Sequence, residues 1–271
     1  MKLIESEVII KEQEPGIDGI YKQIEWAGRH CYKSHDKITE DSAKEFVDRM
    51  IKSKHGAMLE HGTVYLSVPK EETEIIGFHG WCQYSKVRSD LVMEEPCNWL
   101  ITTNMRVLVE HDRLRDLKYI CEPTKRHEKR ITARFTCDRG VSHEIVRHRV
   151  MSFAQESQRY VGYDKEKFGS EVTFIKPHWY DEEFPACLTW IESLKDAEQK
   201  YMDLREAGLK AQDARGVLPN ATKTEIVVTG FESDWEHFFS LRSPKYGAQG
   251  VHPDMAKLAD ELYEKLNSVN K

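Results

Sequence analysis

The spacing of apolar residues along the chain predicts a mixture of strands and helices. Ala43, Phe46, Val47, Met50 and Ile51 recur at intervals that place them on one face of a helix over 40–54, which Thr39 is positioned to cap. In contrast, ITARFTCD at 131–138 alternates between apolar and polar residues, as a half-buried strand does. The same criteria predict strands over 2–10, 62–68, 131–138 and 224–230, and helices over 20–31, 40–54, 141–151, 183–207, a shorter segment ending at Arg215, 234–241 and 253–266. These elements indicate an α/β (α+β) fold with a central mixed or antiparallel sheet flanked by long helices.

Two segments show no clear period. Residues 70–130 carry dense charge clusters and are predicted to be helical or irregular, forming an insertion or subdomain. Residues 152–180 include Pro177 and several aromatic residues, and they are predicted to form a loop. A chain of 271 residues can bury one large core or two modest ones. We therefore expect a single domain over 1–271 that contains the 70–130 insertion.

The composition indicates a folded, cytoplasmic protein. Hydrophobic residues make up 39% of the chain and charged residues 32%, without a low-complexity tract. No apolar run approaches the roughly 18 residues of a membrane span, and the first residues do not resemble a signal peptide. The six cysteines lack C-x-x-C spacing, which is typical of reduced thiols. Neither a disulfide framework nor a metal site is expected.

The overall charge restricts where an anion can bind. A net charge of −6 repels polyanions from the molecule as a whole. Any anion site must therefore be local, and clustered arginines are the place to look for it.

The densest arginine cluster lies in RHRVMSFAQESQRY, residues 147–160. On the expected helix over 141–151, Arg149 shares a face with Ile145 and Val146, so its guanidinium is predicted to be partly buried. A buried guanidinium requires a fixed anionic or aromatic partner. Ser157 and Arg159 add a hydroxyl group and a second fork of donors that suits phosphate.

A structural explanation competes for each arginine taken singly. An isolated arginine usually forms a surface ion pair, and Arg215 and Arg242 are each placed to interact with a helix C-terminus. However, residues 147–160 combine four basic side chains, two serines and a tyrosine within fourteen residues of an acidic protein. This density favours a phosphate or nucleotide site.

The motif resembles the signature of flavin-dependent thymidylate synthases. That signature is R-H-R, seven residues and then Ser, which here is Arg147-His148-Arg149 to Ser157. Three further regions resemble the family in the same order along the chain. They are Arg29-His30-Cys31-Tyr32-Lys33-Ser34; HGAMLEH from His55 to His61; and the C-terminal group Ala214-Arg215, Leu218-Pro219, His237-Phe238, Leu241-Arg242 and Ala248-Gln249. The resemblance covers most of the chain except about 70–130.

The resemblance implies a homotetramer with active sites at subunit interfaces. Such an enzyme methylates dUMP to dTMP with FAD, NADPH or NADH, and methylenetetrahydrofolate. The residues that the resemblance assigns to FAD are Ala57, Arg147, His148, Arg149, Gln155 and His237, and those that it assigns to dUMP are Glu144, Arg147, Gln155, Ser157, Arg159, Arg215 and Arg242. Arg242 is implied to be catalytic, because a cation against the uracil ring favours its N3 anion.

Several positions depart from the family pattern. Ala154 replaces a usual Asn, Gln155 and Glu156 alter a usual Glu-containing pair, and Glu144 replaces a usual Gln. Phe231 and His237 stand where Asn is common. These departures concern the flavin contacts and leave the phosphate-binding residues intact.

Parts of the sequence also suggest three other functions. A related flavin- and folate-dependent pyrimidine-nucleotide hydroxymethylase would use the same residues. A zinc hydrolase is suggested by HEIVRH, but His143 and His148 are five residues apart, about 140° around a helix, instead of four. A nucleic-acid-binding module is suggested by the basic run 125–130, although interleaved acids and net acidity favour a solvated charged surface.

Overall fold

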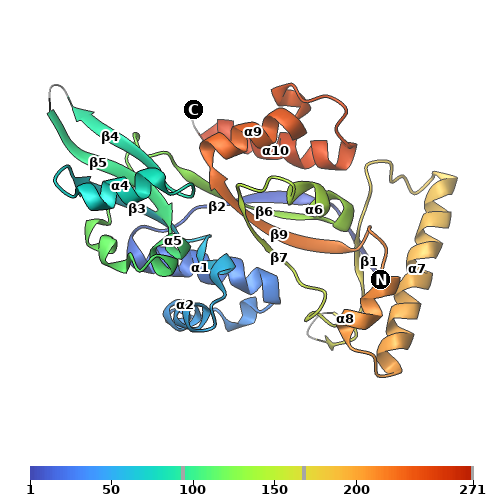
Figure 1. The fold of residues 1–271 in the computed structure, drawn as a ribbon. Helices are drawn as coiled ribbons and strands as arrows, with labels where there is room; N and C mark the ends of the chain where they lie inside the picture. Colours follow the sequence, from blue (N-terminus) through green and yellow to red (C-terminus); the bar gives the residue numbers. More distant parts are fainter. Residues whose placement is uncertain (93–94, 167–168, 270–271) are drawn as a thin grey trace.

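The computed structural model describes the backbone of residues 1–92, 95–166 and 169–269, and their side chains except those of 90–92, 95–97 and 269. Its largest sheet is antiparallel, with the strand order β2 (Glu7–Lys11), β6 (Arg130–Asp138), β9 (Lys223–Phe231) and β7 (Ser152–Gln155). The sheet runs through the middle of the molecule (Figure 1). The expected α/β class, with an antiparallel central sheet, is confirmed.

Alternation along β6 and β9 explains how helices cover this sheet. Phe135 pairs with Ile226 and both face a core completed by α9 (Glu232–Arg242) and α10 (Pro253–Val269). The neighbouring Val227 faces the opposite side, where it joins the core formed with α1 (Gly16–Tyr32). Both faces of the sheet are therefore buried, with α9 and α10 on one side and α1 on the other (Figure 1).

The 70–130 region holds most of a second sheet, so its prediction as helical or irregular is wrong for the strands. β3 (Thr63–Pro69), β5 (Glu95–Asn104) and β4 (Lys86–Val92) form an antiparallel sheet in the order β3-β5-β4. Val87 packs on the main N-terminal core, whereas Lys86 carries its ammonium over the Phe231 ring at the end of β9. Apolar and polar residues alternate only briefly in these strands and lie among many charged residues, so the sequence pattern did not reveal them. Pairing of β5 with β3 stabilises the sheet.

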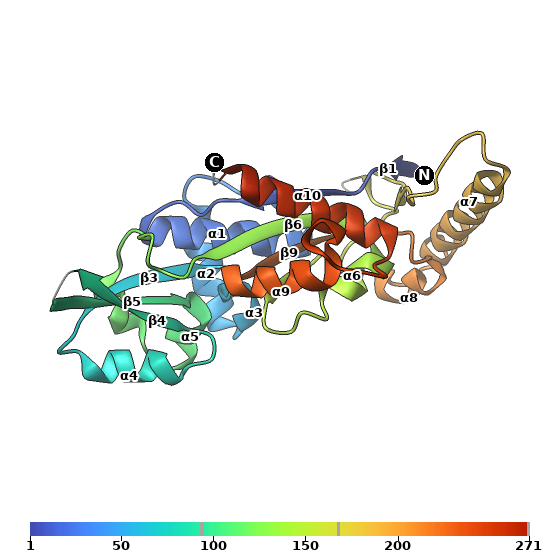
Figure 2. The same ribbon diagram turned by 90° about the horizontal axis from the view of Figure 1, so that it is seen from above.

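Helices and short turns complete the insertion and the two ends of the molecule. The insertion contains α4 (Thr73–Trp81), α5 (Met105–Glu110) and the 3-10 helix η2 (Leu114–Tyr119). Outside it lie α2 (Ser42–Lys52), α3 (Gly56–Leu59), α6 (Arg139–Ile145), α7 (Pro185–Glu206), α8 (Ala211–Ala214), η1 (His35–Lys37), η4 (Arg215–Val217) and η5 (Pro244–Tyr246). The molecule is elongated, with the insertion at one end and α7 at the other (Figure 2). In the part of the chain that the structure describes, none of the helices combines the length and apolarity that a membrane span requires.

Four local predictions require correction. The expected strand over 2–10 is two strands, because β1 (Lys2–Ile4) pairs with β8 (Thr173–Ile175) in parallel while β2 joins the main sheet. The expected loop over 152–180 therefore contains β7 and β8. Thr39 does not cap α2, whose N-cap is Asp41 without a side-chain hydrogen bond.

The expected helix over 141–151 is shorter and displaced. Asp138 caps α6 by accepting a hydrogen bond from the Val141 amide, and the helix ends at Ile145. The chain then turns, because β7 has to begin at Ser152 in order to pair with Thr229 of β9. The pairing of β7 with β9 therefore ends this helix. Residues 141–151 contain no glycine or proline, so the sequence gives no local signal of that end.

Candidate functional site

The turn after α6 presents two arginines to solvent and buries the histidine between them. Arg147 and Arg149 are exposed, whereas His148 is 6% exposed. Neither arginine forms an ion pair with a carboxylate of the described residues. The prediction that Arg149 is partly buried is therefore wrong, because α6 has already ended and Arg149 does not share a helical face with Ile145. The exposed pair remains a strong donor set for an anion.

His148 connects this turn to the end of α9. Arg242, in the last turn of α9, forms an ion pair with Glu144 of α6, and its Nε donates to His148 Nε2 at 3.4 Å. The His148 ring lies 4.8 Å from the Phe238 ring and 6.2 Å from the exposed His237 ring. Residues far apart in the sequence thus form one cluster, which we call the Arg242 cluster: Glu144, His148, His237 and Arg242.

The electrostatic environment keeps His148 neutral. Burial, together with the neighbouring charges of Arg242 and His237, lowers the pKa of His148 to about 4. An uncharged imidazole can accept the hydrogen bond from Arg242. The positive charge of the cluster therefore resides on Arg242, where Glu144 offsets it.

Strand β7 leads from this cluster to a buried ion pair. Gln155 donates from Nε2 to Ser142 Oγ at 2.9 Å and to Thr224 Oγ1 at 3.3 Å, which ties β7 to α6 and β9. The next residue, Glu156, is 2% exposed and accepts from Lys223 Nζ at 2.8 Å. Sequence reasoning overlooked this pair, although a lysine at the start of a strand with an apolar centre was a usable signal.

A second group of predicted residues converges around Tyr32. Ser157 donates its amide to the Cys31 carbonyl at 3.1 Å, and the Tyr160 ring lies 6.0 Å from the Tyr32 ring. The Tyr32 hydroxyl is 3.4 Å from His55 Nδ1. We call Tyr32, His55, Ser157 and Tyr160 the Tyr32 cluster. It borders a hollow of about 550 Å³ whose lining includes Tyr32 and His55.

Two residues of the N-terminal segments are occupied by structural contacts. Arg29 is buried and donates from Nε and Nη2 to Glu25 Oε1 at 3.0 and 2.7 Å. His61 is fully buried beside Thr229, with 2.8 Å between His61 Nδ1 and Thr229 Oγ1, and burial with the nearby Arg130 lowers its pKa to about 3. In this single chain, Arg29 and His61 serve the core.

Of the remaining predicted residues, Arg159 touches the Tyr32 cluster, whereas Ala57 and Arg215 are placed by their own helices. Ala57 is exposed on α3, two residues after His55. Arg159 is exposed and lies over the Tyr160 ring, 5.6 Å from its centre. Arg215 is the C-cap of α8 and donates from Nε to the Gln212 carbonyl at 3.1 Å. Arg215 therefore interacts with a helix C-terminus, which was the structural explanation given for it in the sequence analysis.

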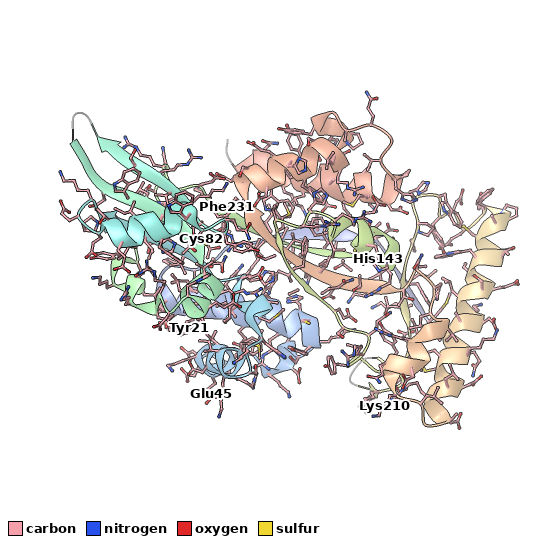
Figure 3. All side chains as sticks on the ribbon, viewed as in Figure 1. Tyr21, Glu45, Cys82, His143, Lys210 and Phe231 are labelled. Atoms are coloured by element: carbon pink, nitrogen blue, oxygen red, sulfur yellow. The ribbon has the colours of Figure 1, made fainter. Side chains whose placement is uncertain are left out.

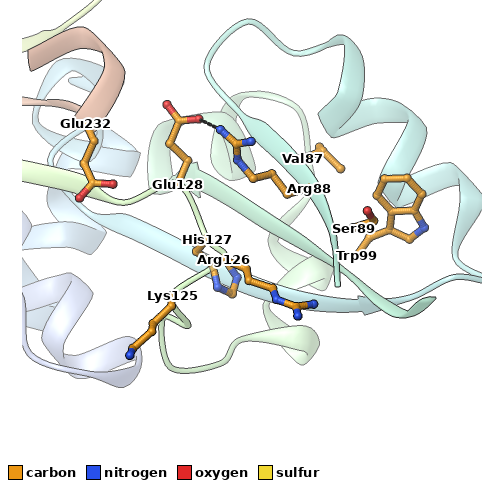
Figure 4. A pocket seen from close by; sticks show the side chains of 9 residues that line it. All are labelled: Val87, Arg88, Ser89, Trp99, Lys125, Arg126, His127, Glu128 and Glu232. Atoms are coloured by element: carbon orange, nitrogen blue, oxygen red, sulfur yellow. Dashed lines mark hydrogen bonds and ion pairs between the residues drawn. The ribbon is translucent and has the colours of Figure 1, made fainter. Parts of the chain in front are cut away.

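The basic run of the insertion lines a separate, open hollow of about 730 Å³ (Figure 4). Arg88 donates to Glu128 at 2.8 Å across this hollow, and Glu128 also accepts from Ser233. Arg130 turns inward and donates to the Glu60 carbonyl at 2.8 Å. Glu128 and the inward-facing Arg130 interrupt the basic run, as expected for a solvated charged surface.

The HEIVRH segment does not form a metal-binding helix. His143 is exposed on α6 (Figure 3), whereas His148 lies beyond the end of that helix and faces Phe238. The arrangement can instead bind anions. Arg147 and Arg149 are accessible, and Arg242 is held within reach of His148 and Glu144.

Comparison with known proteins agrees with the motif. The family model described as "Thymidylate synthase complementing protein" matches residues 127–269, more than half of the chain. The flavin-dependent thymidylate synthase of Pyrococcus furiosus is 36% identical over 129 residues, covering 48% of this chain and 52% of that protein. The enzyme of the same name from Mycobacterium tuberculosis is 36% identical over 140 residues, covering 48% and 54%.

These similarities have a defined extent. The chain spans about half the length of the curated relatives that it matches. Among solved structures, the UMP/dUMP methylase PolB from Streptomyces cacaoi, bound with 5-Br dUMP, aligns with a TM-score of 0.48 and 15% identity, over 99% of this chain and 93% of that one. Because the family model matches more than half of the chain and includes the whole R-H-R to Ser segment, the chain belongs to the thymidylate synthase complementing protein family.

Proposed function

We propose that this protein catalyses the reductive methylation of dUMP to dTMP with FAD, a reduced nicotinamide cofactor and methylenetetrahydrofolate. The observation that carries the proposal is the Arg242 cluster within the family-matched region. This cluster joins the R-H-R turn to the end of α9. It therefore places Arg242, which we assign to the uracil ring, beside the turn that carries Arg147 and Arg149, which we assign to phosphate. The curated relatives named flavin-dependent thymidylate synthase support the same reaction.

The residues of the R-H-R turn fit the phosphate groups of FAD. Arg147 and Arg149 offer exposed guanidinium groups without a carboxylate partner among the described residues. A diphosphate is the kind of anion that such forks bind bidentately. In this assignment His148 and His237 lie beside the cofactor, with Ala57 and Gln155 near it. When bound, the reduced flavin supplies the hydride of the reaction.

We assign dUMP to residues from α6, from the segment that follows it and from η4. Ser157 and Arg159 bind its phosphate, Arg215 adds a second guanidinium, and Arg147, Glu144 and Gln155 complete the site. Arg159 is exposed with its charge unpaired by the described carboxylates, which suits a phosphate ligand. Arg215 donates only to a backbone carbonyl within the described residues, so its charge is also unneutralised.

Arg242 is the proposed catalytic residue. Placed against the uracil ring, its charge stabilises the N3 anion and thereby enriches C5 in electron density for attack on the one-carbon unit. Glu144 holds the guanidinium in place through the ion pair, and neutral His148 orients it from the other side. The family's usual Gln at position 144 would position Arg242 without offsetting its charge.

Three of the six cysteines are poorly suited to nucleophilic attack on dUMP. Burial raises the pKa of Cys31 to about 11, and it raises the pKa of Cys121 and Cys137 above the usual thiol value. Protonated thiols are weak nucleophiles. A flavin hydride route needs no enzyme thiolate, so these environments are consistent with the proposal.

We further propose that the enzyme is a homotetramer whose sites lie between subunits. Arg147, Arg149 and Arg159 are exposed on one chain, where bound nucleotides between two chains would cover them. Gln155 is assigned to a neighbouring subunit's site. NADPH or NADH is the expected reductant, and methylenetetrahydrofolate the expected carbon donor.

The test is product formation by the purified chain. We would load it with FAD, add NADPH, dUMP and methylenetetrahydrofolate, and identify the nucleotide by mass spectrometry. dTMP that depends on both flavin and folate supports the proposal. A product heavier than dTMP by one oxygen atom would indicate the hydroxymethylase reaction, and a flavin-loaded chain that forms neither product would refute the proposed reaction. Six single Cys→Ala variants complete the experiment, because loss of turnover in a stable, flavin-loaded variant would contradict the thiol-independent route.

A further inference from the structure

Three potential metal ligands converge at the start of α10, away from the Arg242 and Tyr32 clusters. His178 lies in the segment between β8 and α7, whereas His252 and Asp254 lie at the start of α10. One ligand atom from each residue lies within 4.8 Å of those from the other two. His178 Nδ1 is 3.5 Å from Asp254 Oδ1, and His252 Nδ1 is 3.8 Å from Asp254 Oδ2.

These separations are close to those of a bound metal. Zinc bonds of about 2.0–2.1 Å in tetrahedral geometry place neighbouring ligand atoms about 3.3 Å apart. Both imidazoles are exposed, so burial does not prevent their rotation to close the remaining distance. Asp254 is the fixed member, since it is 9% exposed and accepts the His178 amide at 2.7 Å.

One imidazole nitrogen beside the carboxylate has a geometry compatible with metal binding. The Asp254 amide lies 3.3 Å from His252 Nδ1 in donor geometry, which favours the tautomer whose lone pair is on Nδ1. Metal ligands require neutral, unprotonated imidazole nitrogens. A metal at His252 Nδ1 would replace this long hydrogen bond with a coordinate bond.

The adjoining hollow adds negative charge. It has a volume of about 330 Å³ and is lined in part by Asp138, Glu144, Trp179, Trp190, His252 and Asp254. No lysine or arginine appears among the described residues that line it. Burial is the main cause that raises the pKa of the Asp138 carboxyl, and the Asp254 carboxylate adds to it; Glu144 is paired with Arg242. A divalent cation beside this hollow would offset that charge.

From this geometry we infer a divalent transition-metal site, with Zn²⁺ as the preferred ion, formed by His178, His252 and Asp254. Two histidines and one carboxylate suit zinc or another borderline metal, and three protein ligands leave a fourth position for water. Bound metal would fasten the segment before α7 to the first turn of α10. The inference is independent of the proposed methylation reaction.

Metal binding by the full chain, stripped of metal by a chelator and desalted, provides the test. Zn²⁺ would be titrated by isothermal calorimetry, and Co²⁺ would be added as a spectroscopic probe of nitrogen and oxygen coordination. We expect one ion per chain and a higher melting temperature with Zn²⁺. His252→Ala and His178→Ala should each weaken binding by at least about tenfold, as loss of even an outer-shell partner can do.

Two further variants separate this site from nonspecific binding. Asp254→Asn retains an acceptor for the His178 amide while removing the charge, so a folded protein with weakened binding is expected. His111→Ala removes an exposed histidine of the insertion and should leave the affinity unchanged. Unchanged binding in both His178→Ala and His252→Ala, or an equal loss in His111→Ala, would overturn the assignment. Absence of Zn²⁺ binding by the wild-type chain would also overturn it.

Discussion

The insertion and the segment from Arg147 to Tyr160 use arginine in opposite ways. In the insertion, arginines are paired with carboxylates: Arg88 with Glu128 at 2.8 Å, and Arg113 and Arg115 with Glu74, each at 2.7 Å. In the family-matched half, Arg147, Arg149 and Arg159 are exposed without such a partner among the described residues. Arginine therefore stabilises the insertion through ion pairs, whereas the charges of Arg147, Arg149 and Arg159 are available to bind an anion. Pairing, more than the number of arginines, separates the structural surface from the candidate binding site.

Two cations of the family-matched half fall between these extremes. Arg242 is half-buried and paired with Glu144, and Lys223 is buried and paired with Glu156. We interpret the first pair as a device that positions a catalytic cation and the second as structural. Substitutions at both pairs can distinguish these interpretations.

The largest expected effect follows from breaking the buried pair. Lys223→Met leaves the Glu156 carboxylate, 2% exposed, without its nearest cation, and should lower the free energy of unfolding by about 3–5 kcal/mol in urea denaturation. Lys223 also donates to Glu225 at 2.5 Å, so the double variant Lys223→Met/Glu156→Gln, which neutralises only the more buried of the two stranded carboxylates, should recover part of that loss. A single variant that loses less than about 1 kcal/mol would show that the pair is not structural.

Removing the Arg242 guanidinium should mainly affect chemistry. Arg242→Ala is expected to lower kcat by roughly 10²–10³, the effect of losing one group that stabilises transition-state charge. Flavin reduction by NADPH should survive, whereas single-turnover reoxidation with dUMP and methylenetetrahydrofolate should slow. As the matched comparison, Arg215→Ala should mostly raise KM, because its contact is made in ground state and transition state alike. Reoxidation of Arg242→Ala at the wild-type rate with dTMP formed would refute its catalytic assignment.

Flavin affinity tests whether an unpaired arginine marks a binding site. Arg149→Ala should weaken FAD binding by about 10–100-fold, since a hydrogen bond to a charged group is worth about 1.5–3 kcal/mol. Fluorescence titration with FAD would measure the change. Arg115→Ala, which removes a paired and exposed arginine of the insertion, is the control and should leave FAD affinity unchanged. Equal FAD affinities in the two variants would show that the unpaired arginine does not mark the flavin site.

The titration of His148 reports on the charge of Arg242. NMR should give a pKa of about 4 for His148, and Arg242→Ala should raise that pKa without reaching 6.5, because burial is the larger cause of the lowering. The unfolded chain binds this proton at a higher pH than the folded one does. The contribution of His148 to stability is therefore full above about pH 6.5 and is lost as the pH falls towards 4. A His148 pKa that is identical in the wild type and the variant would place Arg242 elsewhere in solution.

The smallest effect is expected in the insertion. Arg88→Ala breaks an ion pair whose arginine is exposed, and the free energy of unfolding should change by less than about 1 kcal/mol. Turnover and FAD affinity should remain at wild-type values. A loss of dTMP formation in this variant would show that the insertion has a functional role, and would contradict the view that its paired arginines are only structural.

The sequence by itself determined the family, the fold class and most of the elements of regular period. Residues 131–138 and 224–230 alternate with a period of two, and 183–207 has the length and the terminal Gly208 of a helix, so local physics predicted β6, β9 and α7. The R-H-R to Ser spacing identified the family because it is a short, continuous motif. Each of these signals lies within a few turns or one strand of the chain.

Only the tertiary structure decided which side chains are buried and which meet. It buried His148 instead of Arg149, because β7 has to pair with β9 and α6 ends early. It also brought Arg242 to Glu144 and His178 to Asp254, contacts between segments distant in the sequence. No local period encodes such contacts, since they depend on how sheets and helices pack against one another.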